Sequence, residues 1–358
     1  MSKIRLGLIG GGKRSEYFMR AVKYLPEVFE VSSAYMRNPE KAAIYGEKFG
    51  IKTTTSFEEM LADKPEFVIL CLPRSVTLGY IEKLFQAKMP ILCETPPASS
   101  VEELNELWSL IKKYDGKMQV SEQYFAWPLY SAWLNAIDQG LIGEPNLVNM
   151  GAIHGYHGVN MINRFLKITN ENCVIRGKQY KTAVTLCEDR TGKVYTDEIT
   201  EQVQDMVSFE FENGKFAFYN WSNMQYHSDI RTRHITVQGT KGEIDDLTIR
   251  YINSENHVVA QTLNRVDLGV YNITEWSNKG IMLGDKFIYE SPFPQARVND
   301  DELAVATCMY KMRAFVEKGE EFYPMKEALQ DSYLSLLLYQ SVKTPLEPIQ
   351  SETQSWYK

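Results

Sequence analysis

A run of three glycines near the start of the chain has the spacing of a phosphate-binding loop. The segment Gly10-Gly11-Gly12-Lys13-Arg14-Ser15 follows the apolar run Ile4–Ile9 and precedes residues with helical spacing. Glycines in this place allow a tight turn and a close approach of backbone amides to a pyrophosphate, and the N-terminus of the next helix adds partial positive charge. Ser15 is small enough for the third place of the G-x-G-x-x-G pattern. The segment therefore predicts a dinucleotide site at Gly10, Gly11 and Gly12, with Lys13 and Arg14 either beside the phosphates or exposed.

The residues after the second apolar run bear on which dinucleotide is bound. The stretch Tyr35-Met36-Arg37-Asn38 contains no acidic residue that could bind the ribose 2′-hydroxyl of NAD. A guanidinium can pair with a 2′-phosphate and stack on adenine. Arg37 therefore favours NADP(H) over NAD(H); the alternative is a solvated arginine with no ligand role.

Two histidines, His154 and His157, are the candidates for proton transfer. The ordinary pKa of an imidazole lies near physiological pH, where a proton shuttle between an alcohol and a ketone is most useful. We expect His157 to act as the catalytic acid–base and His154 to share its site; alternatively, His157 only packs or hydrogen-bonds at the start of a helix. No cysteine or carboxylate near this pair in the sequence completes a ligand set, so no metal site is predicted.

Further candidates for a substrate site stand on either side of these histidines and before them. Glu122 and Tyr124 lie at the predicted carboxyl end of the last parallel strand, where Tyr124 could donate a proton and Glu122 could orient a sugar hydroxyl. Glu122 could equally cap the segment that links two domains. Aromatic faces suit the apolar faces of a sugar ring, so we expect Trp127 to bind substrate, together with Tyr156 and Asn160.

Two patterns of elements must position these residues. Residues 1–125 alternate apolar runs with amphipathic helical stretches, which predicts a Rossmann-type, doubly wound parallel sheet that binds the dinucleotide at the carboxyl ends of its strands. Residues 126–358 are rich in strands with short glycine-containing turns, which predicts a substrate-binding domain built on an open, mainly antiparallel sheet flanked by helices. One of its strands is expected over Glu243–Tyr251, and the polar stretch 344–358 is expected to run over the surface.

Composition limits the classes of partner. The 358 residues are 44% apolar and 24% charged with a net charge of −7, so neither nucleic acid nor an anionic membrane is a predicted partner. No run of about 18 apolar residues is present that could span a membrane. The five cysteines are scattered without a C-x-x-C pair, as expected for buried free thiols in a reducing compartment, and the start of the chain lacks the features of a signal peptide. We therefore expect a cytoplasmic protein.

The order of these motifs resembles the Gfo/Idh/MocA family, which includes glucose–fructose oxidoreductase, inositol dehydrogenase and rhizopine catabolism proteins. The resemblance covers nearly the whole chain. Besides the glycine loop, the similar segments are Asn38–Ala42, Leu72–Ser75, Cys93–Pro96, Gly140–Glu144 and Val237–Ile244.

The resemblance implies further site residues. Pro73 and Arg74 would belong to the loop on the nicotinamide side, and Glu94-Thr95-Pro96 occupies the place of the family's E-K-P motif near the nicotinamide. Thr95 stands where the family has a lysine that binds substrate and assists proton transfer. In the second motif of the family an aspartate precedes the histidine by four residues; here that position is Ile153, four residues before His157.

The resemblance also implies an activity. The family's members move hydride between NAD(P) and a hydroxyl carbon of a sugar, polyol or related compound, and often assemble as homodimers or homotetramers through the open face of the second sheet. Because Thr95 and Ile153 replace two functional residues, a non-catalytic or regulatory protein that binds cofactor or sugar is an alternative. Cofactor-assisted elimination or glycoside cleavage, with NAD bound tightly and recycled, is another.

Overall fold

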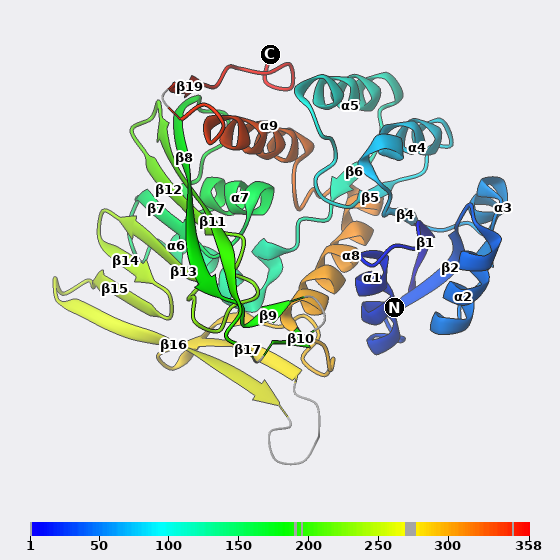
Figure 1. Cartoon of the computed structure of the whole chain (residues 1–358). Coiled ribbons are helices and arrows are strands. Elements are labelled where there is room, and N and C mark those ends of the chain that lie inside the picture. The colour runs from blue at the N-terminus through cyan, green and yellow to red at the C-terminus, as the bar shows by residue number, and fades with distance from the viewer. Residues whose placement is uncertain (1, 190–191, 195, 269–276, 346) are drawn as a thin grey trace. The chain divides into compact units, whose positions relative to one another are not determined.

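The computed structural model describes residues 2–189, 192–194, 196–268, 277–345 and 347–358 (Figure 1). The chain forms two compact units. The first consists of Met1–Ser131, Arg265–Ile281 and Tyr289–Leu329, and the second of Ala132–Asn264, Met282–Ile288 and Gln330–Lys358. The assignment of the dinucleotide and substrate domains to 1–125 and 126–358 stays a prediction.

The first unit contains a six-stranded parallel sheet in the order β3-β2-β1-β4-β5-β6. Its strands are β1 (Ile4–Ile9), β2 (Phe29–Tyr35), β3 (Thr53–Thr54), β4 (Phe67–Leu70), β5 (Ile91–Cys93) and β6 (Met118–Val120). The helices between them are α1 (Ser15–Tyr24), α2 (Pro39–Phe49), α3 (Phe57–Ala62), α4 (Arg74–Gln86) and α5 (Val101–Tyr114), and the 3-10 helix η1 (Tyr124–Ala126) follows β6. The strand order reverses between β1 and β4, which places a crevice for ligands at the carboxyl ends of these two strands. The predicted Rossmann-type sheet is confirmed.

Local chemistry explains where these elements begin. Asn38 caps α2, because its side-chain oxygen accepts a hydrogen bond from the amide of Lys41 (2.9 Å) and Pro39 occupies the first helical position. Ser56 and Ser100 cap α3 and α5 in the same way. Strand β4 is buried along its whole length, as a run of apolar residues covered on both faces should be.

The core of the first unit includes α8 (Asp300–Lys318), a helix encoded far along the chain and lying beside α1 in Figure 1. Buried residues that α8 contributes to this core include Leu303, Val305, Ala306, Met309, Met312 and Phe315, and those from β1 and α1 include Ile4, Leu6, Leu8, Phe18 and Met19. A capping box starts the helix: the Asn299 side chain accepts from the amide of Glu302, whose carboxylate accepts from the amide of Asn299.

An eleven-stranded sheet occupies the later part of the chain, in the order β18-β17-β16-β15-β14-β13-β7-β12-β11-β8-β19. The strands are β7 (Pro145–Gly151), β8 (Cys173–Thr185), β11 (Ile199–Phe211), β12 (Phe216–Ser222), β13 (His234–Gly239), β14 (Gly242–Asp245), β15 (Thr248–Ile252), β16 (Val258–Leu268), β17 (Ser277–Leu283), β18 (Lys286–Glu290) and β19 (Ile349–Gln350); β9 (Glu188–Asp189) and β10 (Gly192–Lys193) form a separate pair. Most neighbours are antiparallel, whereas β7 and β12 are parallel. Helices in this part are α6 (Pro128–Asp138), α7 (Gly155–Leu166) and α9 (Met325–Ser341). The predicted mainly antiparallel sheet is confirmed.

Two local predictions are wrong. The strand predicted over Glu243–Tyr251 is two antiparallel strands, β14 and β15, because the chain reverses near Asp246, which has a φ of 48°. The stretch 344–358 does not simply run over the surface: β19 pairs with β8, and the side chain of Trp356 is 1% exposed and donates a hydrogen bond to Gln330 (3.1 Å). The free energy gained by burying the large apolar ring of Trp356 outweighs the preference of its polar neighbours for water.

All five cysteines are free; Cys93, Cys173 and Cys308 are buried, and Cys71 and Cys187 are half-buried. In the described part of the chain, no helix is both long enough and apolar enough to cross a membrane.

Candidate functional site

A cavity of about 290 Å³ opens at the carboxyl ends of β1, β2 and β4 in the first unit. The residues that line it are Ile9, Gly10, Gly11, Gly12, Tyr35, Met36, Arg37, Asn38, Lys41, Cys71, Leu72, Pro73 and Tyr80. Three separate predictions therefore meet in one place: the glycine loop, Arg37 and Pro73.

The glycine loop fits a phosphate group. Gly10 has a φ of 109° and any Cβ atom at this position would overlap the carbonyl oxygen of Cys71, so only glycine is tolerated there. A Cβ atom at Gly11 would collide with the side chain of Met36. At Gly12, by contrast, a Cβ atom would meet nothing within 4 Å. The loop is thus packed against the sheet on one side and open on the other, as a backbone that receives a pyrophosphate must be.

Ser15 takes the third position of the glycine pattern without loosening it. Its side chain is fully buried, its hydroxyl donates to the carbonyl oxygen of Gly12 (2.6 Å), and it accepts from the hydroxyl of Tyr45 (2.9 Å). These two bonds hold the start of α1 against the loop.

Positive groups gather at the α2 end of the cavity. Arg37 and Lys41 both line it, and the cap by Asn38 leaves the N-terminus of α2 beside them. Lys41 was not singled out from the sequence. The capping pattern that begins at Asn38 could have indicated it, because the capped turn brings the third residue after Asn38 to the cavity. On the same wall the hydroxyls of Tyr35 and Tyr80 lie 3.2 Å apart, and burial together with Tyr80 raises the pKa of Tyr35 to about 12.

Some residues predicted for the cofactor do not line this cavity. Lys13 and Arg74 are exposed and are not among the residues that line the cavity. Thr95 and Pro96, joined by a cis peptide bond, are half-buried after β5 and do not line it either.

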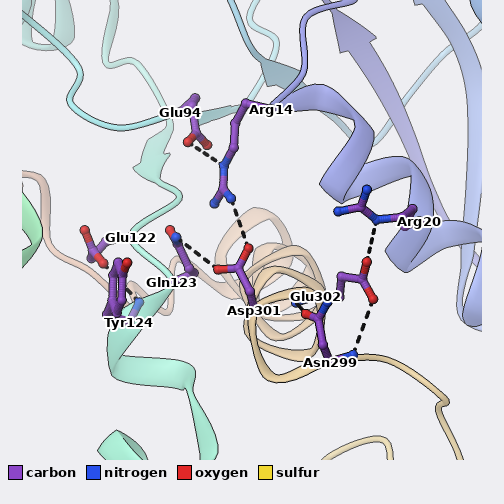
Figure 2. Close-up of polar contacts among 9 residues, drawn as sticks. All are labelled: Arg14, Arg20, Glu94, Glu122, Gln123, Tyr124, Asn299, Asp301 and Glu302. Atoms are coloured by element: carbon purple, nitrogen blue, oxygen red, sulfur yellow. Dashed lines mark hydrogen bonds and ion pairs between the residues drawn. The ribbon is translucent and has the colours of Figure 1, made fainter. Parts of the chain in front are cut away.

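Arg14 takes part in an ion cluster inside the first unit, drawn in Figure 2. Its Nε donates to Oε1 of Glu94 (2.7 Å) and its Nη1 to Oδ2 of Asp301 (3.2 Å). Gln123 donates to the other oxygen of Asp301 (3.2 Å). Burial acts to lower the pKa of Arg14, but Glu94 and Asp301 outweigh it and raise that pKa, so the guanidinium stays charged.

Glu122, Tyr124 and Trp127 belong to the segment that follows β6. Glu122 is fully buried and its carboxylate accepts a hydrogen bond from the amide of Tyr124 (3.0 Å), at the start of η1. The ring of Tyr124 is stacked on that of Trp127 (centroids 5.3 Å apart) and on that of Tyr130 (6.0 Å). The carboxylate of Glu122 thus binds the backbone of the segment that follows β6, and both interpretations of its role made from the sequence stay predictions.

In the second unit, His154 and His157 lie together at the start of α7. Their ring centroids are 5.0 Å apart and both side chains are half-buried. Nδ1 of His154 and the hydroxyl of Tyr226 are 3.0 Å apart, and the Tyr226 ring packs on Trp221 (centroids 4.4 Å apart). The guanidinium carbon of Arg233 lies 4.7 Å from the centroid of the Tyr226 ring. Sequence spacing could not join Tyr226 to His154, because 72 residues separate them.

Asn160 and Tyr156, on the same helix, serve its packing. Asn160 is 1% exposed and its amide donates to Asp331 of α9 (2.7 Å), which also accepts from the amide of Asn163 (2.6 Å). Tyr156 is buried with its ring centroid 5.6 Å from that of His157. Among the residues described, no group of three or more His, Cys, Asp and Glu side chains could hold a metal ion.

Comparison with known proteins supports this picture of the first unit. Residues 4–122 match the model of an oxidoreductase family with an NAD-binding Rossmann fold. The chain is 24% identical over 152 residues to D-xylose 1-dehydrogenase [NADP(+)] of Haloarcula marismortui, covering 41% of this chain and 42% of that protein. It is 26% identical over 153 residues to levoglucosan dehydrogenase of Pseudarthrobacter phenanthrenivorans, covering 40% and 39%. The matches thus span less than half of these relatives.

Among solved structures, an oxidoreductase from Agrobacterium radiobacter in complex with NAD+, L-tartaric acid and magnesium superposes with a TM-score of 0.69 at 16% identity. The superposition covers 97% of this chain and 98% of that one. The fold is therefore shared along 97% of this chain, whereas the family model matches residues 4–122.

Proposed function

We propose that this chain, whose residues 4–122 match the model of the Gfo/Idh/MocA oxidoreductase family, is an NAD(P)-dependent oxidoreductase that moves hydride to or from a hydroxyl carbon of a sugar, polyol or related small molecule. The observation that carries the proposal is the cavity at the glycine loop, where Gly10 is required by the backbone and Gly12 faces open space. When bound, the dinucleotide supplies the hydride chemistry. The relatives named for xylose and levoglucosan support a carbohydrate-like substrate.

NADP(H) is the proposed cofactor. Arg37, Lys41 and the N-terminus of α2 give the cavity one positively charged end, and none of the residues that line the cavity is acidic. A 2′-phosphate carries close to two negative charges and suits such a site, whereas a 2′-hydroxyl would be expected to pair with a carboxylate. Relatives of both kinds exist, since one is named for NADP+ and one was solved with NAD+.

His157 is the proposed acid–base, and His154 and Tyr226 are proposed to orient it and to bind substrate. The half-buried His157 imidazole is placed to hold a proton at the start of α7, and the contact between His154 and the Tyr226 hydroxyl fixes the neighbouring ring. The aromatic faces of Trp221 and Tyr226 lie within the same cluster, which suits the apolar face of a sugar. In the second unit, the ring of Tyr156 packs beside His157 and Asn160 binds Asp331 of α9. In the first unit, Tyr124, Glu122 and Trp127 shape the segment that follows β6.

Separate titrations with NADPH and NADH test the cofactor proposal. We expect NADPH to bind at least tenfold more tightly than NADH, on the order expected for one added charge pair. Arg37→Gln and Lys41→Gln should each reduce that preference, whereas Lys48→Gln, on the same helix but paired with Glu16, should leave it unchanged. Binding of neither dinucleotide to the wild-type protein would overturn the proposal.

A second candidate is a cofactor- or sugar-binding protein without turnover. It is favoured by Thr95, which supplies no charge, and by Ile153, which is fully buried. A screen of sugars and polyols for absorbance change at the wavelength of reduced nicotinamide separates the two: binding without any turnover would favour this candidate. Tightly bound cofactor that co-purifies and is recycled during cleavage of a glycoside would instead indicate elimination chemistry.

We also propose a cytoplasmic homodimer or homotetramer. Free cysteines suit a reducing compartment. Tyr180, Met206 and Phe218 lie on one face of β8, β11 and β12 and are each more than 40% exposed, which is unusual for large apolar side chains that stay in water. Light scattering of the wild type and of Met206→Glu tests the assembly; a wild-type monomer would contradict it.

A further inference from the structure

The ion cluster of the first unit has more carboxylates than cations. Arg14 lies between Glu94 and Asp301, and Figure 2 shows its side chain extending from the glycine loop toward α8. Among these three side chains two are carboxyl groups and one is a guanidinium. A neighbouring pair offers a contrast: Glu302, one residue after Asp301 on the same helix, is bound by Arg20 of α1.

The cluster is firmly built. Gln123 is 5% exposed and donates to Asp301, while its own oxygen is buried without a partner among the described residues. The capping box at Asn299 fixes the first turn of α8, from which Asp301 projects. Arg14 also lies over the ring of Tyr17, 4.8 Å from its centroid. The charges are therefore held in place and are partly shielded from water, which strengthens their field.

The cluster borders the half of the sheet where a nicotinamide would lie. In a doubly wound sheet the two nucleotide halves bind on either side of the point where the strand order reverses, here between β1 and β4. Arg37 and Lys41 mark the adenosine half beyond β2, so the nicotinamide half falls toward β4 and β5. Glu94 directly follows β5.

One residue links the ion cluster to the cavity. Cys71, which follows β4, lines the cavity. The pKa of its thiol is raised by burial and then by the nearby carboxylate of Glu94, while Arg14 acts in the opposite direction. Glu94 and Arg14 therefore act, in opposite directions, on the thiol of a residue that lines the cavity.

We propose that Glu94, Asp301 and Arg14 set the preference of the protein for the redox state of its nicotinamide cofactor, with the excess carboxylate favouring the oxidised form. The oxidised ring carries one positive charge and the reduced ring none, so a negative environment stabilises only the former. The reduced cofactor would then leave readily. This inference rests on the proposed function, because it requires the dinucleotide to bind.

The test is a set of equilibrium titrations by calorimetry, with NADP+ and NADPH, that needs no turnover. Glu94→Gln and Asp301→Asn each remove one negative charge and should shift the ratio of the two affinities toward NADPH by about tenfold, the order of magnitude expected for one unit charge in a partly buried site. Arg14→Met removes the cation and should shift the ratio the other way.

The opposite signs separate a role of charge from a role of structure. Glu94→Gln and Arg14→Met break the same ion pair, so loss of geometry alone would move both ratios in the same direction, and that result would overturn the proposal. Glu302→Gln is the matched control: it neutralises the adjacent carboxylate of α8, which Arg20 binds, and should leave the ratio unchanged. Should Arg14→Met fail to fold, Arg14→Lys keeps the charge and should preserve the wild-type ratio.

The proposed function and the inference on redox state would fail in distinguishable ways. If the wild type binds neither form of the cofactor, the proposed function falls and this inference with it. If the wild type binds both forms and Glu94→Gln and Asp301→Asn leave the ratio of affinities unchanged, only the inference on redox state is overturned.

Discussion

The two compact units use their polar residues in different ways. In the first, a backbone feature defines the site: the turn at Gly10, the open face at Gly12 and the capped start of α2 all border one cavity. In the second, the polar side chains of α7 are divided. Asn160 and Asn163 bind the buried carboxylate of Asp331, while His154 and His157, at the start of the helix, are half-buried beside an aromatic cluster.

The difference shows what each kind of site depends on. A backbone site needs particular φ angles and small residues, and the residues that meet these requirements are adjacent in the sequence. A side-chain site needs groups from distant strands and helices, as with His154 and Tyr226, and the same residue types also hold helices together. Mutations can therefore be chosen to separate function from support in each unit.

The largest effect is expected at the glycine loop. Gly10→Ala places a Cβ atom against the carbonyl oxygen of Cys71 at a φ of 109°, so we expect the free energy of unfolding to fall by about 3 kcal/mol and binding of NADPH to become undetectable. Urea unfolding and fluorescence titration measure the two quantities.

Gly79→Ala makes the same chemical change in α4, where nothing lies within 4 Å of the new atom. It should leave the affinity for NADPH unchanged and raise the free energy of unfolding by up to about 1 kcal/mol, because alanine is the better helix former. Wild-type affinity for NADPH in Gly10→Ala would show that the loop is not the cofactor site, and the contrast between the units would disappear.

The next effect concerns the histidines of the second unit. His157→Ala should lower kcat by about a hundredfold, because a general acid–base contributes at least that much, while the affinity for NADPH stays within about twofold. Steady-state kinetics on the best substrate of a sugar panel measures it. His257→Ala, at an exposed position of the same unit, is the control. Unchanged kcat in His157→Ala would place the proton transfer elsewhere.

A smaller effect is expected where polar residues act as support. Asp331→Ala leaves the buried amides of Asn160 and Asn163 without their shared acceptor and should lower the free energy of unfolding by about 2 kcal/mol, with little change in cofactor affinity. Asp138→Ala removes only an exposed pair with Lys167 and should cost less than about 0.5 kcal/mol. If Asp331→Ala were as stable as the wild type, these asparagines would be available for another role.

The smallest effect belongs to the cap of α2. Asn38→Ala removes the acceptor for the amide of Lys41 and should lower the free energy of unfolding by about 1 kcal/mol, whereas Asn38→Ser should restore most of the loss. Thermal melting of the three proteins, followed by titration with NADPH, shows whether the cap also positions Lys41. If the free energy of NADPH binding falls by more than the free energy of unfolding, the cap also positions Lys41.

Much of the fold could be predicted from the sequence, and less of the site. The bounds of β1, α1 and β2 follow from apolar runs, glycines and caps, all of which are local. The reversal near Asp246 and the burial of Trp356 could not be predicted, because each is decided by packing against residues distant in the chain. For the same reason Arg14 could be placed near a phosphate loop but not paired with Asp301, nearly three hundred residues away.

The position of α8 has a consequence for how the protein is made. A ribosome delivers the chain from its N-terminus, and the parallel sheet of residues 4–120 emerges long before residues 300–318, which complete its core. Until then the apolar surface of Leu6, Phe18 and Met19 lacks its covering helix. The apolar surface of the nascent first unit therefore stays partly exposed during most of translation. A fragment that ends at residue 125 would consequently be a poor autonomous domain and a natural client for chaperones.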